Sequence, residues 1–168
     1  FRPAASQQAV ATYHRALEID GSLVRPNVEL CRLYNRLIEP AQAREYGRRA
    51  LAGYQTLGNR GGEAQAMFCL TDTLRTGTPA ERQEAGRHAA AALTILEELK
   101  SEYNLPRAHY YVAAAAIAQG DASGAAAWWT RALEGARQTG NGVLEPLVSM
   151  NLGVAYSALG NPLLASDY

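Results

Sequence analysis

Apolar and polar positions follow a helical period along almost the whole chain. Alanine and leucine recur three or four positions apart with polar residues between them, a pattern that predicts amphipathic helices. Four of these segments contain an Ala-Leu pair with another alanine seven positions upstream, and these pairs begin at positions 16, 50, 92 and 132. The pairs recur roughly every 40 residues, a spacing that suits one helical hairpin each. The pattern therefore predicts a tandem repeat of helix pairs.

Turn residues divide the chain into units of this length. We expect a half repeat over 5–20, helix pairs over 25–57, 62–98 and 106–138, and a partial repeat over 143–168. Gly58 and Gly140 follow second helices and are expected to end them in a left-handed conformation. Thr78 is a candidate N-cap in the turn of the second pair, and Asn161-Pro162 suits the start of a last helix. The first residue is not Met and both ends hold unpaired helices, which indicates an array cut short at both ends.

Composition supports an all-α chain and disfavours several partners. Alanine occurs 32 times and leucine 20 times, against 7 valines and 4 isoleucines, so helix formers predominate. Sixteen basic and sixteen acidic residues give a formal net charge of zero, which argues against nucleic acid or an anionic membrane as a partner. No apolar run approaches the roughly 20 residues that span a bilayer.

The two cysteines, Cys31 and Cys69, lie on the expected first helices of two different units. Two cysteines cannot make a disulfide framework, so we expect Cys31 to be a packing residue and Cys69 to lie in the core or slightly exposed. Free cysteines of this kind indicate a reducing compartment, and we expect a cytoplasmic location.

The search for catalytic chemistry gives no site. The histidines at 14, 88 and 109 fall in three different units without metal-ligand spacing, and no nucleophile motif or phosphate-binding loop is present. The carboxylates at 72, 97 and 98 are expected to be solvated on helix surfaces. Of the adjacent Trp128 and Trp129, about 100° apart on a helix, we expect Trp129 in the core and Trp128 beside it. We therefore expect no metal, no cofactor and no enzymatic activity.

The segment from Asn151 to Tyr156, followed by Leu159-Gly160-Asn161, matches the L-G-x-x-Y element and closing glycine of the tetratricopeptide repeat (TPR), so the chain resembles this family. The small residue of this element corresponds to Cys31, Thr71, Ala113 and Gly153 in successive units, where only small side chains let two helices approach closely. No unit has the leading Trp or the closing Pro. With units of roughly 40 residues, the chain resembles the longer-repeat LGN, kinesin light chain and MalT-like groups.

The resemblance implies a right-handed α-solenoid whose concave face is lined by the first helices and binds peptides. Projecting the repeat onto the chain gives these candidate groove residues: Val28, Arg32, Asn35, Arg36, Phe68, Asp72, Arg75, Arg107, Tyr110, Ala114, Leu147, Met150, Asn151 and Val154. Arginines gather at one end and apolar residues at the other. We expect a partner segment with acidic and apolar residues, bound by the arginines, Tyr110 and Met150.

Three alternatives accompany this hypothesis. The MalT-like resemblance implies a ligand-sensing region of a bacterial signalling or transcription regulator. An enzyme with an unrecognised site would need ionisable groups gathered in one cleft, which the spacing does not show. The unpaired helices at the two ends also suggest head-to-tail self-association, because a repeat cannot bury its apolar face alone.

Overall fold

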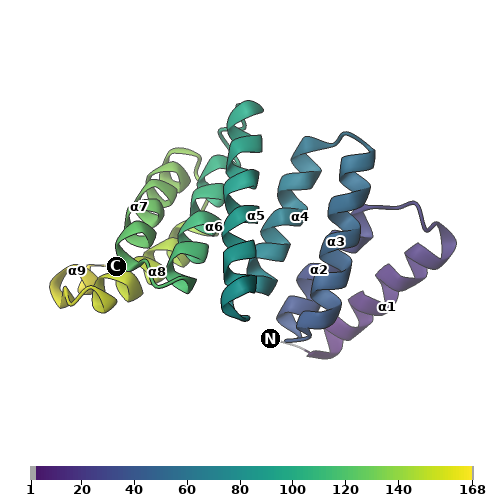
Figure 1. The fold of residues 1–168 in the computed structure, drawn as a ribbon, viewed down its shortest axis with the longest axis horizontal. Coiled ribbons are helices and arrows are strands. Elements are labelled where there is room, and N and C mark those ends of the chain that lie inside the picture. Colours follow the sequence, from purple (N-terminus) through teal and green to yellow (C-terminus); the bar gives the residue numbers. More distant parts are fainter. Residues whose placement is uncertain (1–2, 168) are drawn as a thin grey trace.

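The computed structural model describes residues 3–167, and all of its regular secondary structure in that range is α-helical. Residue 168, which ends the last expected unit, lies outside the described residues. The helices are α1 (Pro3–Ile19), α2 (Arg25–Arg36), α3 (Pro40–Thr56), α4 (Arg60–Leu74), α5 (Pro79–Glu98), α6 (Leu105–Ala118), α7 (Ala122–Gln138), α8 (Leu144–Ala158) and α9 (Pro162–Ser166). Each packs on the next, and in Figure 1 they form a curved row from α1 to α9. This is the expected α-solenoid architecture.

Local sequence signals set the ends of several helices. Gly58 and Gly140 adopt φ values of 61° and 66° after α3 and α7, as expected for left-handed C-terminal caps. Thr78 caps α5 and forms a capping box with Glu81: each side chain accepts a hydrogen bond from the other residue's backbone N–H. Asn161 caps α9 by accepting a hydrogen bond from the Leu164 N–H at 3.2 Å. These turns fix the short connections that make consecutive helices antiparallel.

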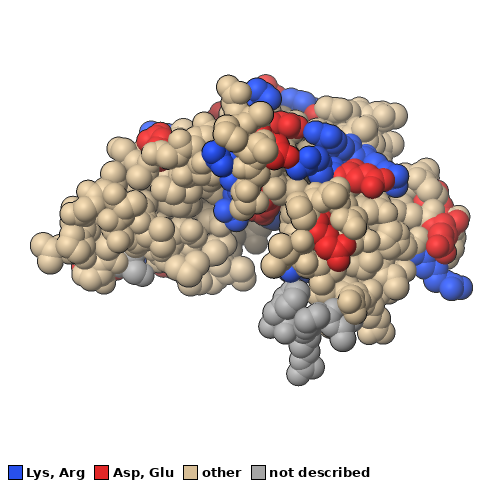
Figure 2. Space-filling view, turned by 60° about the horizontal axis from the view of Figure 1, so that its bottom comes forward, with Lys and Arg blue, Asp and Glu red and all other residues tan. Residues whose placement is uncertain are grey.

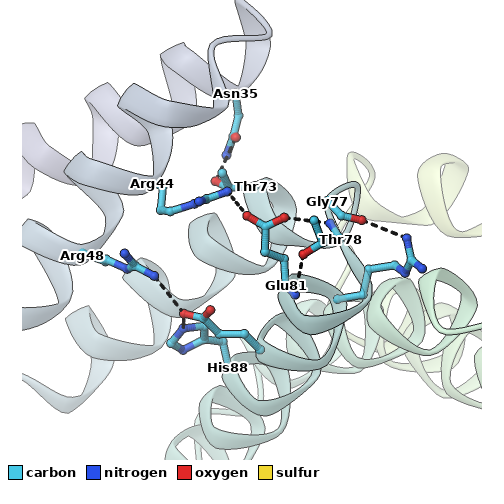
Figure 3. Close-up of polar contacts among 10 residues, drawn as sticks. Asn35, Arg44, Arg48, Thr73, Gly77, Thr78, Glu81 and His88 are labelled. Carbon is cyan, nitrogen blue, oxygen red and sulfur yellow. Dashed lines mark hydrogen bonds and ion pairs between the residues drawn. The ribbon is translucent and has the colours of Figure 1, made fainter.

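The array curves because its two layers of helices are spaced differently. The first helices α2, α4, α6 and α8 each contact the next first helix directly, whereas α3 and α5 have no such backbone contact within the part of the chain that the structure describes. Two ion pairs between long side chains bridge this wider gap. One joins Arg44 to Glu81, and the other joins Arg48 to Glu84, whose carboxylate also lies beside His88 (Figure 3). The layer with the shorter spacing lies on the inside of the curve, so the first helices form the concave face.

Small side chains occupy the closest helix contacts. Cys31, Thr71 and Ala113 are each fully buried, as the shared role of these positions predicts, whereas Gly153 in the last unit is only half-buried. Trp129 is only 2% exposed and lies in the cluster between α6, α7 and α8, and Trp128 packs at its edge, as expected. Each helix pair thus completes its core against the following pair rather than around a single centre.

The prediction for the cysteines was wrong. Cys31 and Cys69 form a disulfide that joins α2 to α4, with their Cα atoms 6.3 Å apart. Both residues are buried, as expected, but neither is a free thiol. The inference of a reducing compartment from free cysteines therefore loses its basis, because disulfides form and persist in oxidising environments.

Charge is distributed unevenly along the array. In Figure 2, arginine and acidic side chains gather over the middle of the visible face, whereas the end that holds α8 and α9 in Figure 1 shows almost only uncharged residues. None of the helices within residues 3–167 is both long enough and apolar enough to cross a membrane.

Reduction of the Cys31–Cys69 disulfide is expected to destabilise the fold. The bond closes a loop of 38 residues in sequence, and its loss raises the entropy of the unfolded chain, which lowers the free energy of unfolding by about 4 kcal/mol. Urea unfolding of the wild-type chain with and without a phosphine reductant measures this. The Cys31→Ala/Cys69→Ala double variant is the control, because it has no disulfide and its urea unfolding midpoint should be the same with and without the reductant. An unchanged wild-type midpoint after complete reduction would contradict the prediction.

Candidate functional site

The candidate groove residues all lie on the first helices, α2, α4, α6 and α8, or at the C-cap of α4. They divide into a buried group and an accessible group. Val28, Phe68 and Ala114 are at most 2% exposed, so they support the concave face from beneath and do not present their side chains to a partner, contrary to the expectation. The accessible group forms a row that crosses the four helices.

The α2 end of this row is a hollow of about 450 Å³ lined by Glu29, Arg32, Asn35, Arg36 and Asp72. Arg32 donates a hydrogen bond to Glu29 at 2.9 Å, which neutralises its charge locally. Arg36 is exposed and forms no hydrogen bond or ion pair within the described residues. Of these two arginines, Arg36 is therefore the one available to an anionic group.

Asn35 joins α2 to α4 and is already fully engaged. Its Nδ2 donates a hydrogen bond to the Cys69 carbonyl at 3.2 Å. Its Oδ1 accepts a hydrogen bond from the Thr73 hydroxyl at 2.9 Å, which is drawn in Figure 3. Both groups of the amide thus hold the helix next to the disulfide. The structure assigns Asn35 a positioning role beneath the groove.

Asp72 connects α4 to α6. It accepts a hydrogen bond from the Tyr111 hydroxyl at 2.9 Å and another from Arg75 at 3.2 Å. Burial raises the pKa of Tyr111 above its ordinary value, and the nearby Asp72 charge raises it further. Tyr111 therefore stays protonated at neutral pH and remains a donor to Asp72. The Asp72 carboxylate is therefore held by two side chains of the chain itself, Tyr111 and Arg75.

The middle of the row is an aromatic platform beneath Arg107. The Phe68 and Tyr111 rings stack with centroids 4.6 Å apart, and the Arg107 guanidinium lies 5.5 Å and 5.8 Å from the two centroids. Tyr110 packs edge-on against Tyr111 at 5.3 Å. Burial raises the pKa of Tyr110, with a smaller contribution from Asp72, while a hydrogen bond with Asn151 on α8 acts in the opposite direction. The row thus reaches α8.

The α8 end of the row is apolar and accessible. Leu147, Met150 and Val154 are 38%, 60% and 58% exposed, and they lie on one side of the helix at spacings of three and four residues. Leu147 also lines a hollow of about 430 Å³ together with Tyr110 and Val143. The concave face therefore offers cationic groups on α2 and α6 and apolar groups on α8.

Sequence reasoning missed the partners that fix this row. Tyr111 and Thr73 were not among the candidate groove residues. A signal was present: Asn35 and Thr73 are 38 residues apart and Asp72 and Tyr111 are 39 apart, close to one repeat. Polar residues one repeat apart occupy equivalent positions on neighbouring first helices and can therefore meet.

The three histidines of the chain take no part in a metal-binding cluster within the described residues. Among these residues, no three His, Cys, Asp and Glu side chains gather closely enough to hold a metal ion. His14 packs against Tyr34 and Tyr46 and hydrogen-bonds the Tyr34 hydroxyl at 2.9 Å. Burial lowers the pKa of His88 and of His109, with Arg131 adding to the effect on His109. Both imidazoles are therefore neutral at pH 7.

Comparison with known proteins identifies the fold. No family model and no curated protein matches the sequence. Among solved structures, a Rap protein complexed with competence and sporulation factor superposes with a TM-score of 0.83 at 19% identity, over 98% of this chain and 48% of the other. The TPR-like repeats of a putative kinesin light chain from Podosopora anserina give 0.73 at 16% identity, over 96% and 82%. MamA gives 0.62 at 17% identity, over 95% and 81%.

These similarities establish a TPR-like helical solenoid. The chain spans about half the length of the Rap chain that it matches. At sequence identities this low, the comparisons concern the fold alone.

Replacing Tyr111 by Phe tests the link between α4 and α6. The variant loses the hydrogen bond to the Asp72 carboxylate while keeping the stacked ring, so the free energy of unfolding should fall by about 1 to 2 kcal/mol. Urea unfolding measures the change. Tyr103→Phe is the matched control, because Tyr103 is 64% exposed and forms no hydrogen bond through its hydroxyl within residues 3–167. Equal stabilities of the two variants would rule out a structural role for this bond.

Proposed function

We propose that the chain is a non-catalytic interaction module whose concave face binds an extended or helical segment of a partner protein. The observation that carries this proposal is the accessible row across α2, α4, α6 and α8, which has arginines without a carboxylate partner at Arg36 and Arg107 and apolar side chains at Leu147, Met150 and Val154. A segment with acidic residues toward α2 and apolar residues toward α8 complements this row.

The charge of the first helices supports an acidic partner. Although the whole chain is formally neutral, α2, α4, α6 and α8, together with the C-cap Arg75, carry more arginines than carboxylates. The arginines are Arg25, Arg32, Arg36, Arg60, Arg75 and Arg107, and the carboxylates are Glu29, Glu63, Asp72 and Glu145. The similarity to a Rap protein complexed with competence and sporulation factor is consistent with binding by a fold of this shape.

A ligand-sensing region of a bacterial signalling or transcription regulator is the second candidate. It is favoured by a hollow of about 500 Å³ beside α6 and α7, where Glu102, His109, Arg131 and Glu134 meet. A small molecule bound there would lie away from the concave face. The two candidates thus place the ligand on different surfaces.

We also propose that copies of the chain associate head to tail, with α1 of one copy packing beside α8 and α9 of the next. No residue of α9 is buried, and Leu163 and Leu164 are 80% and 39% exposed. A second copy that covered these side chains would remove apolar surface from water.

The groove proposal predicts that a charge placed on α8 blocks binding. Peptides selected from a displayed library of random 12-residue sequences should bind Met150→Glu about tenfold or more weakly than wild type, because Met150 is 60% exposed on the concave face and the new carboxylate repels an acidic segment. Ala127→Glu, on the exposed side of α7, is the matched control. Equal weakening by both variants, or by neither, would argue against the groove.

Self-association predicts a concentration-dependent mass. Size-exclusion chromatography with light scattering should show dimers or larger species as the concentration rises, and Leu163→Glu should return the chain to a monomer by placing a charge in the contact. A wild-type chain that stays monomeric across the concentration series would exclude this contact.

A further inference from the structure

The four arginines expected in the groove are not equivalent. Arg32 is paired with Glu29 at 2.9 Å and Arg75 with Asp72 at 3.2 Å, both three residues apart on the same helix or its cap. Arg36 and Arg107 have no carboxylate partner among residues 3–167. An acidic group that approaches the concave face therefore meets two arginines whose charge is not already neutralised.

Arg107 differs from Arg36 because its guanidinium is held in place. It lies over the stacked rings of Phe68 and Tyr111, which are only 2% and 8% exposed and cannot move without disturbing the core. The Tyr111 hydroxyl donates a hydrogen bond to Asp72, which further restrains the Tyr111 ring. The attraction between the guanidinium and the two rings restrains the Arg107 side chain, so it loses less rotamer freedom than an unrestrained arginine when it binds a carboxylate.

Hollows flank Arg107 on both sides. The smaller one, about 190 Å³, lies toward α4 and α5 and is lined by Phe68, Leu96 and Leu99. The larger one, about 430 Å³, lies toward α8 and is lined by Tyr103, Tyr110 and Leu147. Arg107 and Asn104 line both hollows, so together they form the ridge between them. Leu99, Tyr103 and Leu147 are 49%, 64% and 38% exposed, which leaves apolar surface on each side of the ridge.

We propose that Arg107 selects a partner segment in which one acidic side chain is flanked by apolar side chains two positions before and two positions after it. In an extended segment, residues i−2, i and i+2 point to the same side at a spacing of roughly 7 Å. The central carboxylate binds the Arg107 guanidinium, and the neighbours on that side enter the two hollows. An aliphatic side chain suits the smaller hollow and an aromatic one the larger. This inference rests on the proposed function and names the specificity of that site.

A selection followed by a double-mutant cycle tests the proposal. A displayed library of random 12-residue peptides is selected on the immobilised wild-type chain with its disulfide intact, and the binders should be enriched in the apolar-x-acidic-x-apolar pattern. Replacing the central Glu of a selected peptide by Gln should weaken binding to wild type about tenfold. The same replacement should change binding to Arg107→Gln by less than twofold, because the partner of the carboxylate is gone.

Two controls make the cycle specific to Arg107. Arg36→Gln removes the other arginine that lacks a carboxylate partner and should leave the tenfold effect of the peptide Glu→Gln change intact. Arg107→Lys keeps the charge but lacks the planar guanidinium that can bind a carboxylate with two N–H groups, and we expect it to retain only part of the effect. Urea unfolding of each variant confirms that the comparison is between folded chains.

The outcomes separate this inference from the proposed function. If selected peptides lose binding to Met150→Glu but their Glu→Gln change costs the same in wild type and in Arg107→Gln, the role of Arg107 is refuted and the groove stands. If the selected peptides lack the pattern yet depend on the groove, the specificity proposal fails alone. If no peptide binds in a manner that Met150→Glu weakens, both proposals fail.

Discussion

The close approach of successive first helices is the constraint on which the rest of the structure depends. Small buried side chains at Cys31, Thr71 and Ala113 let helices pack at short range, and the first helices contact one another directly. On the other layer, α3 and α5 make no direct backbone contact within residues 3–167, and long side chains such as Arg44 and Glu81 connect them. Unequal spacing of two layers bends the stack, and the bend places the first helices on its concave face.

Polar groups on this face serve two purposes. Asn35, Asp72 and Tyr111 use their hydrogen bonds to hold α2, α4 and α6 in register, so their partners lie within the chain. Arg36 and Arg107 remain without acidic partners in the described part of the chain. In the function we propose, a partner meets the charges that the structure leaves unneutralised, together with the exposed apolar side chains of α8.

The helices and their caps were predictable from the sequence because their causes are local. Gly58 ends a helix because it adopts a positive φ, and Thr78 begins one because its side chain caps the first turn. Trp129 is buried because of its size and its place in the helical pattern. Each of these effects can be recognised from the residues nearby in the sequence. The Cys31–Cys69 disulfide was missed because buried free cysteines resemble small apolar residues, although their separation of 38 residues is about one repeat. Burial of Phe68 depends on the rotation of α4 about its axis, which periodicity fixes only coarsely. The pairing of Arg32 with Glu29 at three residues' spacing could have been inferred from the sequence.

The most direct measurement of the central claim is a map of backbone amide shifts by nuclear magnetic resonance as a selected peptide is titrated into the isotope-labelled chain. The account predicts that the shifted amides concentrate on the concave side of α2, α4, α6 and α8, with the largest changes near Arg107 and Leu147. Shifts confined to α3, α5 and α7, or to the hollow beside His109 and Arg131, would contradict it.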